Sequence, residues 1–239
     1  MRTTSRLSER ARELDSADPL GGMRTKFLGH DDAAVPAYLD GNSLGRPLAA
    51  TLETLGDFVR SQWGGRLIRG WDEGWLALPR HIGDQLGEHV LGAAPGQCVV
   101  ADSTTVLLYK LARAAVTAVS DGGKRNEIVL DRDNFPTDRY VMEGIAAECG
   151  LTLRWVEADY DGGVRPEAVA AAVGPKTSLV VLSHVAYRSG FIADVPAITE
   201  IVHRAGGRVL WDLCHSAGSV PAELDAWNVD YAAGCSSKY

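Results

Sequence analysis

From residue 97 onward, short runs rich in β-branched residues alternate with segments long enough to form helices. The runs read CVVADS, EIVLDR, LTLRWVEA, SLVVLSHV, RVLWDL and DYAAGCS, and they start at residues 98, 127, 151, 178, 208 and 230. Segments of helical length occupy residues 104–120, 137–149, 165–173 and 194–206. Strands that alternate with such helices form right-handed βαβ crossovers. The pattern therefore predicts an α/β fold of three layers, αβα, with a mostly parallel sheet.

The first 96 residues lack this strand pattern. They begin with an amphipathic segment, and a predicted helix at about residues 49–63 is followed by the Trp- and Arg-rich stretch 64–75. We therefore expect an N-terminal helical segment, residues 1–96, ahead of a sheet domain, residues 97–239.

The composition excludes several classes of protein. With 46% apolar and 23% charged residues, the chain is typical of soluble globular proteins. Its net charge of -7 argues against a nucleic acid or an anionic membrane as partner, and no apolar run approaches the roughly 18 residues of a membrane span. The four cysteines are far apart and form no C-x-x-C pair, so they signal neither a zinc site nor a disulfide framework. We expect no metal and a reducing, cytoplasmic location.

Polar residues follow the predicted strands at their carboxyl ends, where parallel sheets bind ligands. Thr104 and Thr105 follow the first run, directly before an apolar helix, and their hydroxyls and the free N–H groups of the helix start can hold a phosphate. Phe135 and Asp138 flank Pro136 after the second run, where an aromatic ring can lie on a flat ligand and a carboxylate can hold a ring substituent. Each of these residues alone is more often a helix cap or part of a core.

Three further strand ends carry Ser183, Asp212 and Lys238, with His215 close to Asp212. Burying a carboxylate such as Asp212 at the end of an apolar strand is costly unless a cation meets it, and neither Lys nor Arg lies next to it in the sequence. A lone lysine such as Lys238 is usually a solvated surface residue. A phosphate cradle, an aromatic face, a carboxylate and a lysine together are what pyridoxal phosphate (PLP) needs for its phosphate, ring, pyridinium nitrogen and aldehyde.

Six strings in this order resemble the kynureninase family, which consists of PLP enzymes with the aspartate aminotransferase fold (fold type I) in the class V aminotransferase group. They are YLDGNSLGRP, VVADSTTV, NFPTDRYV, LSHVAYRSG, VLWDLCHSAGSVP and GCSSKY, and they run from about Tyr38 to Tyr239. The resemblance implies hydrolysis of the Cβ–Cγ bond of L-kynurenine or 3-hydroxykynurenine, in tryptophan catabolism. The products are anthranilate or 3-hydroxyanthranilate, and L-alanine. It also implies a homodimer when the protein is full length.

The resemblance gives roles to the residues around the cofactor. Thr104 and Thr105 would bind the phosphate end of PLP, and Phe135 would stack on the pyridine ring. Asp138 and Ser183 would bind around the cofactor.

The catalytic residues implied by the resemblance come from the last two motifs. Asp212 would pair with the pyridinium nitrogen, His215 would sit beside the ring, and Lys238 would form the Schiff base and move the α-proton. Four residues of the first part would line the substrate mouth from a partner subunit, although a turn and ordinary packing are their alternative roles: Asn42, Ser43, Arg66 and Trp71.

Three departures from the family stand out. Ser237 occupies the position of a tyrosine that binds the phosphate, and Leu107 occupies that of an asparagine. The sequence also ends at Tyr239, whereas family members continue into further cofactor contacts and a small C-terminal domain that holds the substrate carboxylate. In the family, a later strand lies between the lysine strand and residues 98–103, so we expect a gap there. We expect this truncated chain to be inactive alone.

Two alternatives remain open. The chain could belong to another class V PLP enzyme of the cysteine desulfurase type, or it could be a non-catalytic truncated product. The sequence does not distinguish kynurenine from 3-hydroxykynurenine as substrate.

Overall fold

The computed structural model describes residues 2–118 and 124–238. These divide into two compact units, Met1–Trp75 and Leu76–Tyr239. The boundary between the units lies before residue 96, the end of the N-terminal segment expected from the sequence. The reason is that the segment after Trp75 is hydrogen-bonded to the second unit: Leu224 N donates to Leu91 O, and Asp225 N donates to Gly92 O. In the described part of the chain, every helix is too short or too polar to cross a membrane.

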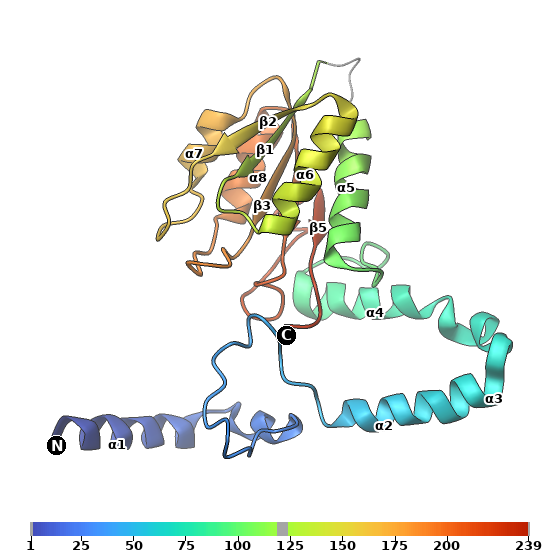
Figure 1. Ribbon diagram of the computed structural model, residues 1–239, viewed down its shortest axis with the longest axis vertical. Coiled ribbons are helices and arrows are strands. Elements are labelled where there is room, and N and C mark those ends of the chain that lie inside the picture. The colour runs from blue at the N-terminus through green and yellow to red at the C-terminus, as the bar shows by residue number, and fades with distance from the viewer. Residues whose placement is uncertain (1, 119–123, 239) are drawn as a thin grey trace. The chain divides into compact units, whose positions relative to one another are not determined.

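The second unit is built on one parallel sheet, which confirms the predicted fold class (Figure 1). The strand order is β2-β1-β3-β4-β5, and every pairing is parallel. The strands are β1 (Glu127–Asp131), β2 (Thr152–Val156), β3 (Thr177–Ser183), β4 (Arg208–Asp212) and β5 (Tyr231–Ala233).

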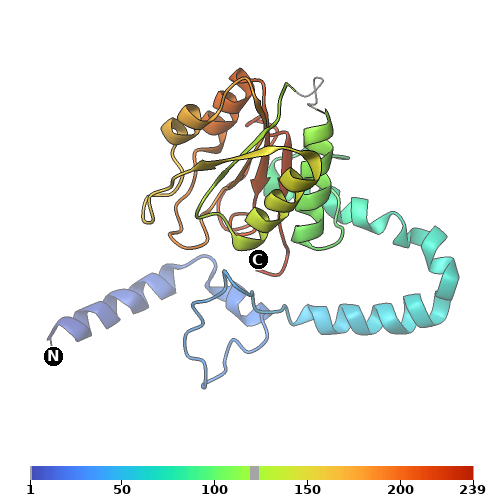
Figure 2. The same cartoon turned by 45° about the horizontal axis from the view of Figure 1, so that its top comes forward.

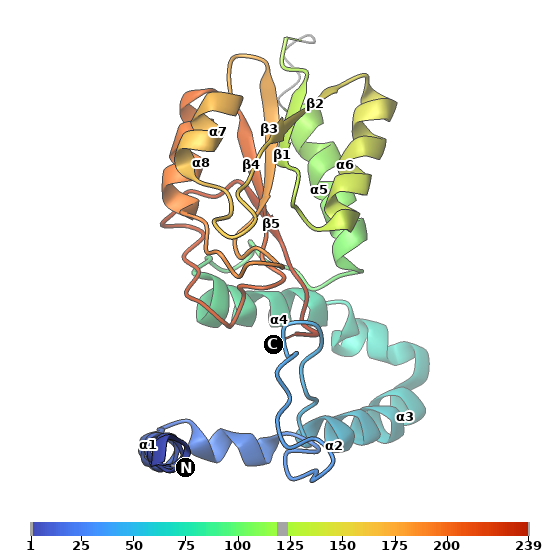
Figure 3. The same cartoon turned by 60° about the vertical axis from the view of Figure 1, so that its left-hand side comes forward.

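Helices cover both faces of the sheet, as the three-layer prediction requires. One face carries α5 and α6 side by side, and the other carries α7 and α8 (Figures 2 and 3). Their bounds are α5 (Thr104–Ala118), α6 (Pro136–Cys149), α7 (Pro166–Ala172) and α8 (Val195–Arg204).

The alternation of side chains along each strand builds two cores. Leu179 and Val181 of β3 pack in the cluster with α5 and α6, while Val180 and Leu182 pack in the cluster with α7 and α8. All four are nearly inaccessible to solvent. A parallel sheet between two helical layers buries both faces of its central strands. This explains why the apolar run of β3 is continuous and does not alternate with polar residues.

The prediction of a strand at residues 98–103 is wrong. Val99 and Val100 are exposed, and the segment is bonded to α4 (Leu78–Leu86) through Val100 N, which donates to Pro79 O at 3.0 Å. An extended segment becomes a strand only when a neighbouring strand supplies the hydrogen-bond ladder. In the described residues no strand pairs with the outer edge of β5.

Glycines let α4 approach this extended segment closely. Gly83 lies against the backbone of residues 98–99, where a Cβ would be 2.8 Å from Val99 Cα. The π-helical turn η5 (Gly87–Leu91) then ends at Gly92, whose φ of 58° is left-handed and whose Cβ would be 2.7 Å from Glu223 Cα. These approaches fix the backbone that leads into α5.

The first unit consists of helices and loops. Within residues 6–75, where burial is described, it has no buried apolar side chain. Leu39 is 91% exposed and Ile68 is 76% exposed. Its elements are α1 (Arg2–Ala17), η1 (Gly21–Lys26), α2 (Ala50–Asp57), η2 (Phe58–Trp63), α3 (Gly64–Arg66), η3 (Leu67–Arg69) and η4 (Trp71–Trp75).

Candidate active site

The carboxyl ends of β3, β4 and β5 meet at one edge of the sheet. The register pairs Ser183 with Asp212, and Asp212 with Ala233. The segment after β5 then brings Lys238 back to the residues that follow β4, where it meets His215. The structure thus gathers the predicted strand-end residues of the second unit at this edge.

Asp212 is a buried carboxylate with few partners. It is 3% exposed. One oxygen, Oδ1, accepts a hydrogen bond from Cys214 N at 2.8 Å, and Oδ2 accepts one from Ser183 Oγ at 3.3 Å. Among residues 2–118 and 124–238 no cationic side chain forms an ion pair with it. A buried carboxylate without an ion pair favours the binding of a cationic ligand. Burial and the Asp212 charge together raise the pKa of the Cys214 thiol, which therefore stays protonated.

Asp138 is a second buried carboxyl group close by, on the first turn of α6. It is 2% exposed, and its Oδ2 has no hydrogen-bond partner. Burial, together with the charges of Asp212 and Asp131, raises its pKa to about 8 against the opposing charge of Lys238. At neutral pH Asp138 is therefore mostly protonated, and its hydroxyl can act as a donor.

Lys238 and His215 form a hydrogen-bonded pair. Lys238 Nζ lies 3.0 Å from His215 Nε2. Burial, and then the charge of Lys238, lower the pKa of His215, so the imidazole is neutral at pH 7. Because an ammonium group can only donate, Nε2 accepts and the imidazole proton resides on Nδ1. That Nδ1 is buried and has no partner.

The ring of Phe135 stands over this pair of side chains. Lys238 Nζ is 5.8 Å from its centroid, and the His215 ring is 6.5 Å away. Tyr187 packs edge-on against it at 5.3 Å and an interplanar angle of 82°. Phe135 keeps 36% of its surface exposed, so a flat ligand at the sheet edge can contact the ring.

The start of α5 lies beside the end of β5. Thr104 Oγ1 donates to Gly234 O at 3.2 Å and is 3.6 Å from Cys214 Sγ. Thr105 is exposed, and Ser103 caps the helix weakly by accepting from Val106 N at 3.5 Å. The N–H groups of this 15-residue helix therefore begin at the same edge as Lys238.

The four predicted substrate residues belong to the first unit, where three of them have local contacts. Ser43 Oγ donates to Asp40 Oδ1 at 2.7 Å, which matches its alternative role in a turn. Arg66 Nε donates to Glu73 Oε2 at 2.7 Å, and the Trp71 ring lies edge-on to Trp75 at 6.0 Å. Asn42 is exposed. Their role toward a substrate stays a prediction.

One residue of the site was missed by the sequence analysis. Asn134 is 3% exposed and links the end of β1 to β3, because its Nδ2 donates to Val181 O and its Oδ1 accepts from Ser183 Oγ. The sequence contains a signal that could have indicated Asn134 as a site residue: it is an amide side chain directly before Phe135, in a stretch that follows a predicted strand.

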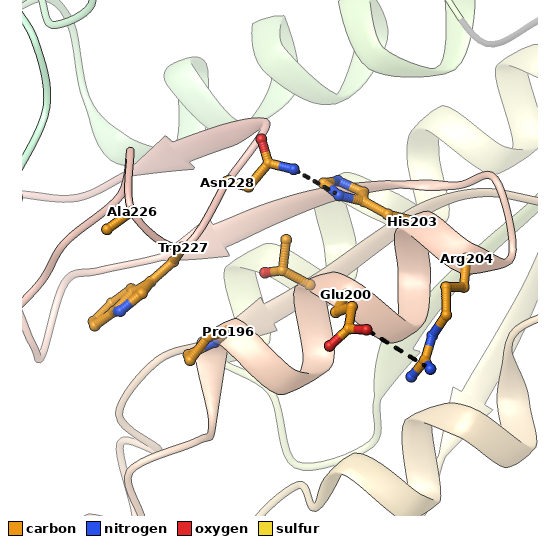
Figure 4. A pocket seen from close by; sticks show the side chains of 8 residues that line it. Pro196, Glu200, His203, Arg204, Ala226, Trp227 and Asn228 are labelled. Carbon is orange, nitrogen blue, oxygen red and sulfur yellow. Dashed lines mark hydrogen bonds and ion pairs between the residues drawn. The ribbon is translucent and has the colours of Figure 1, made fainter.

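A pocket of about 470 Å³ lies elsewhere in the second unit, along α8 (Figure 4). Its polar side chains are already engaged. His203 Nε2 is 2.7 Å from Asp230 Oδ2, and Asn228 Nδ2 is 3.3 Å from His203 Nδ1. Glu200 pairs with Arg204 at 3.7 Å. The pocket therefore presents no unpartnered group comparable to Asp138 or His215.

Comparisons with known proteins give the family of this chain. Residues 88–239 match the family model of class V aminotransferases. The chain belongs to the class V aminotransferase family. Within it the chain is kynureninase-like: kynureninases of Burkholderia pseudomallei (strain 1106a) and Pseudomonas fluorescens are each 38% identical to it, over 97% and 95% of this chain. The alignments cover 54% and 53% of those proteins, so this class V chain spans about half the length of the curated relatives it matches.

Solved structures confirm the large-domain fold of fold type I PLP enzymes for this class V protein. A variant of C-DES with glycine covalently linked to its PLP cofactor superposes with a TM-score of 0.73 and 25% identity, covering 88% of this chain and 54% of that one. The cysteine desulfurase CsdA of Escherichia coli gives a TM-score of 0.74 at 17% identity, covering 92% of this chain and 55% of that one.

The groups left without partners at the sheet edge fit PLP. Among the described residues, Asp212 has no cationic partner, Asp138 Oδ2 has no hydrogen-bond partner, and Lys238 is an amine close to both the aromatic ring and the imidazole. A pyridinium nitrogen, a ring substituent and an aldehyde are the complementary groups.

Proposed function

We propose that this chain is the cofactor-binding N-terminal part of a PLP-dependent kynureninase, a hydrolase that cleaves the Cβ–Cγ bond of L-kynurenine or 3-hydroxykynurenine. The observation that carries the proposal is the buried Asp212 carboxylate without an ion pair, at the same sheet edge as the Lys238–His215 pair. The 38% identity to kynureninases along nearly the whole chain supports this substrate class.

Each residue has a defined task in this proposal. When bound, PLP supplies the electron sink for carbanion chemistry. Asp212 would hold the proton of the ring nitrogen, and Phe135 would cover one ring face. Lys238 Nζ would hold the cofactor through its aldehyde, with loss of water, and would move the α-proton of the substrate. His215 Nε2, at 3.0 Å, keeps that amine aimed at the ring of Phe135.

The remaining tasks concern the edges of the cofactor. Asp138, protonated at neutral pH, donates from its unpartnered Oδ2 to an oxygen on the ring. Ser183 binds beside it. Thr104, Thr105 and the first turn of α5 hold the phosphate through hydroxyls and N–H groups.

A homodimer is part of the proposal. The first unit buries no apolar side chain within residues 6–75, so its leucine and tryptophan side chains need a partner surface. We assign that surface to a second copy, with the predicted substrate-side residues contributed across the dimer. A cytoplasmic location fits the four cysteines, all of which are free thiols.

The test is direct. The purified chain is incubated with PLP, reduced with borohydride, digested and analysed by mass spectrometry, with kynurenine turnover followed by anthranilate fluorescence. We expect PLP to be trapped on Lys238 and turnover to require a version extended to the length of the relatives. An extended version that converts cysteine to alanine and releases sulfide in the presence of dithiothreitol, but releases no anthranilate from kynurenine, would establish the desulfurase alternative instead.

A further inference from the structure

Asn134 is the most completely bonded side chain at the candidate site. It is 3% exposed. Its Oδ1 accepts from Phe135 N at 2.7 Å and from Ser183 Oγ at 3.0 Å, and its Nδ2 donates to Val181 O at 3.3 Å. One amide therefore joins the turn after β1 to two residues of β3.

The chemistry of the partners fixes the orientation of this amide. The backbone N–H of Phe135 can only donate and the carbonyl of Val181 can only accept, so the oxygen and nitrogen of Asn134 cannot exchange places. Phe135 is thereby held at the N-cap of α6, with its ring toward Lys238 and His215.

The bond to Ser183 reaches Asp212. Ser183 has one hydroxyl hydrogen and two acceptors in range, Asn134 Oδ1 at 3.0 Å and Asp212 Oδ2 at 3.3 Å. When the hydrogen points to Asn134, a lone pair of Asp212 Oδ2 is left for a cationic N–H. Asn134 thus acts on both the ring face and the carboxylate of the site, without contacting the space between them.

We infer that Asn134 is a positioning residue for the cofactor: it fixes the Phe135 ring and draws the Ser183 hydroxyl away from Asp212, which leaves that carboxylate free for the ring nitrogen. The inference rests on the proposed function. It assigns a role to a residue outside the predicted set of site residues.

The experiment compares PLP affinity by equilibrium titration across five forms of the chain: wild type, Asn134→Ala, Ser183→Ala, the double variant, and Asn126→Ala. Asn126 is the matched control, since it precedes β1 at the opposite end of the same strand and its Oδ1 has no partner. Asn134→Ala should weaken PLP binding about tenfold, the equivalent of one hydrogen bond, and Asn126→Ala should leave it unchanged.

The double variant separates positioning from a general loss of stability. If Asn134 acts through Ser183, the effect of Asn134→Ala in the Ser183→Ala background should shrink to less than about threefold, because the two residues form one network. Fully additive losses, or equal losses in Asn134→Ala and Asn126→Ala, would overturn the inference.

A second measurement requires no cofactor. Hydrogen exchange by NMR should show that the Phe135 amide, protected in the wild type, exchanges faster in Asn134→Ala, while the amides of β4 stay protected. A wild-type chain that binds no PLP contradicts the proposed function. Unchanged exchange at Phe135 contradicts the inference about Asn134, whatever the outcome for PLP.

Discussion

Lys238 Nζ donates to His215 Nε2 across 3.0 Å, joining a residue after β5 to one after β4. The imidazole accepts because burial and the lysine charge lower the pKa of His215. The amine is thus held at a sheet edge that also carries two buried carboxyl groups, Asp138 and Asp212. The contact gives the lysine a fixed direction before any ligand arrives, which lowers the entropic cost of its reaction.

Replacing Lys238 by Ala should abolish covalent attachment of PLP, because the chain loses the amine that faces the Phe135 ring at 5.8 Å. Borohydride trapping and peptide mass spectrometry measure the attachment. Lys176→Ala, which removes an exposed lysine before β3, is the control and should behave as wild type. Attachment that persists at another lysine of the Lys238→Ala chain would remove Lys238 from its proposed role.

Replacing His215 by Phe should slow PLP attachment about tenfold while preserving the fold, since an aromatic ring of similar size stays and the acceptor for Lys238 is lost with the imidazole nitrogens. A hydrogen bond to a charged group contributes about 1.5–3 kcal/mol, the equivalent of roughly 10- to 150-fold, and we expect the lower end because Lys238 is only partly buried. Stopped-flow absorbance after mixing with PLP gives the rate. The control is His81→Phe, on the exposed side of α4. Equal rates for His215→Phe and wild type would show that the contact plays no part in attachment.

Most of the second unit could be predicted from the sequence, because buried strands such as β3 carry their own signal in a continuous apolar run. Residues 98–103 also contain an apolar run, but among the described residues no strand pairs with them. Whether such a run forms a strand depends on hydrogen bonds from a neighbouring segment, which its own sequence does not reveal. The residues at the sheet edge were predictable because the carboxyl ends of parallel strands lie at the same edge of the sheet for any conformation of the loops.

Asn134 was not predictable in the same way. Its contacts to Val181 and Ser183 span 47 and 49 residues of sequence, so only the register between β1 and β3 reveals them. The pairing of Lys238 with His215 spans 23 residues and likewise depends on how two loops fold back over one edge. Local pattern gives the residue types at a site, whereas hydrogen-bond partners follow from tertiary contacts.

Replacing Ser237 by Tyr should strengthen PLP binding about threefold to tenfold. Ser237 is exposed and directly precedes Lys238, at the position where the resemblance to the kynureninase family implies a tyrosine that binds the phosphate. A phenol adds one hydrogen-bond donor and more apolar surface than the serine hydroxyl. Equilibrium titration with PLP measures the change. Ser236→Tyr, at the neighbouring exposed position, is the control. Equal effects at both positions would show that the gain does not arise from a specific phosphate contact.

Replacing Asp138 by Asn should stabilise the cofactor-free chain above neutral pH. Burial raises the pKa of Asp138 to about 8, well above its value of about 4 in an unfolded chain, so the folded state binds more protons and loses stability as the pH rises between these values. Asparagine mimics the protonated form and removes this loss. Urea unfolding should show little difference at pH 4 and a gain of more than about 1 kcal/mol at pH 9. Exposed Asp161→Asn is the control and should show no such pH dependence. A gain that is the same at both pH values would mean that Asp138 is ionised throughout.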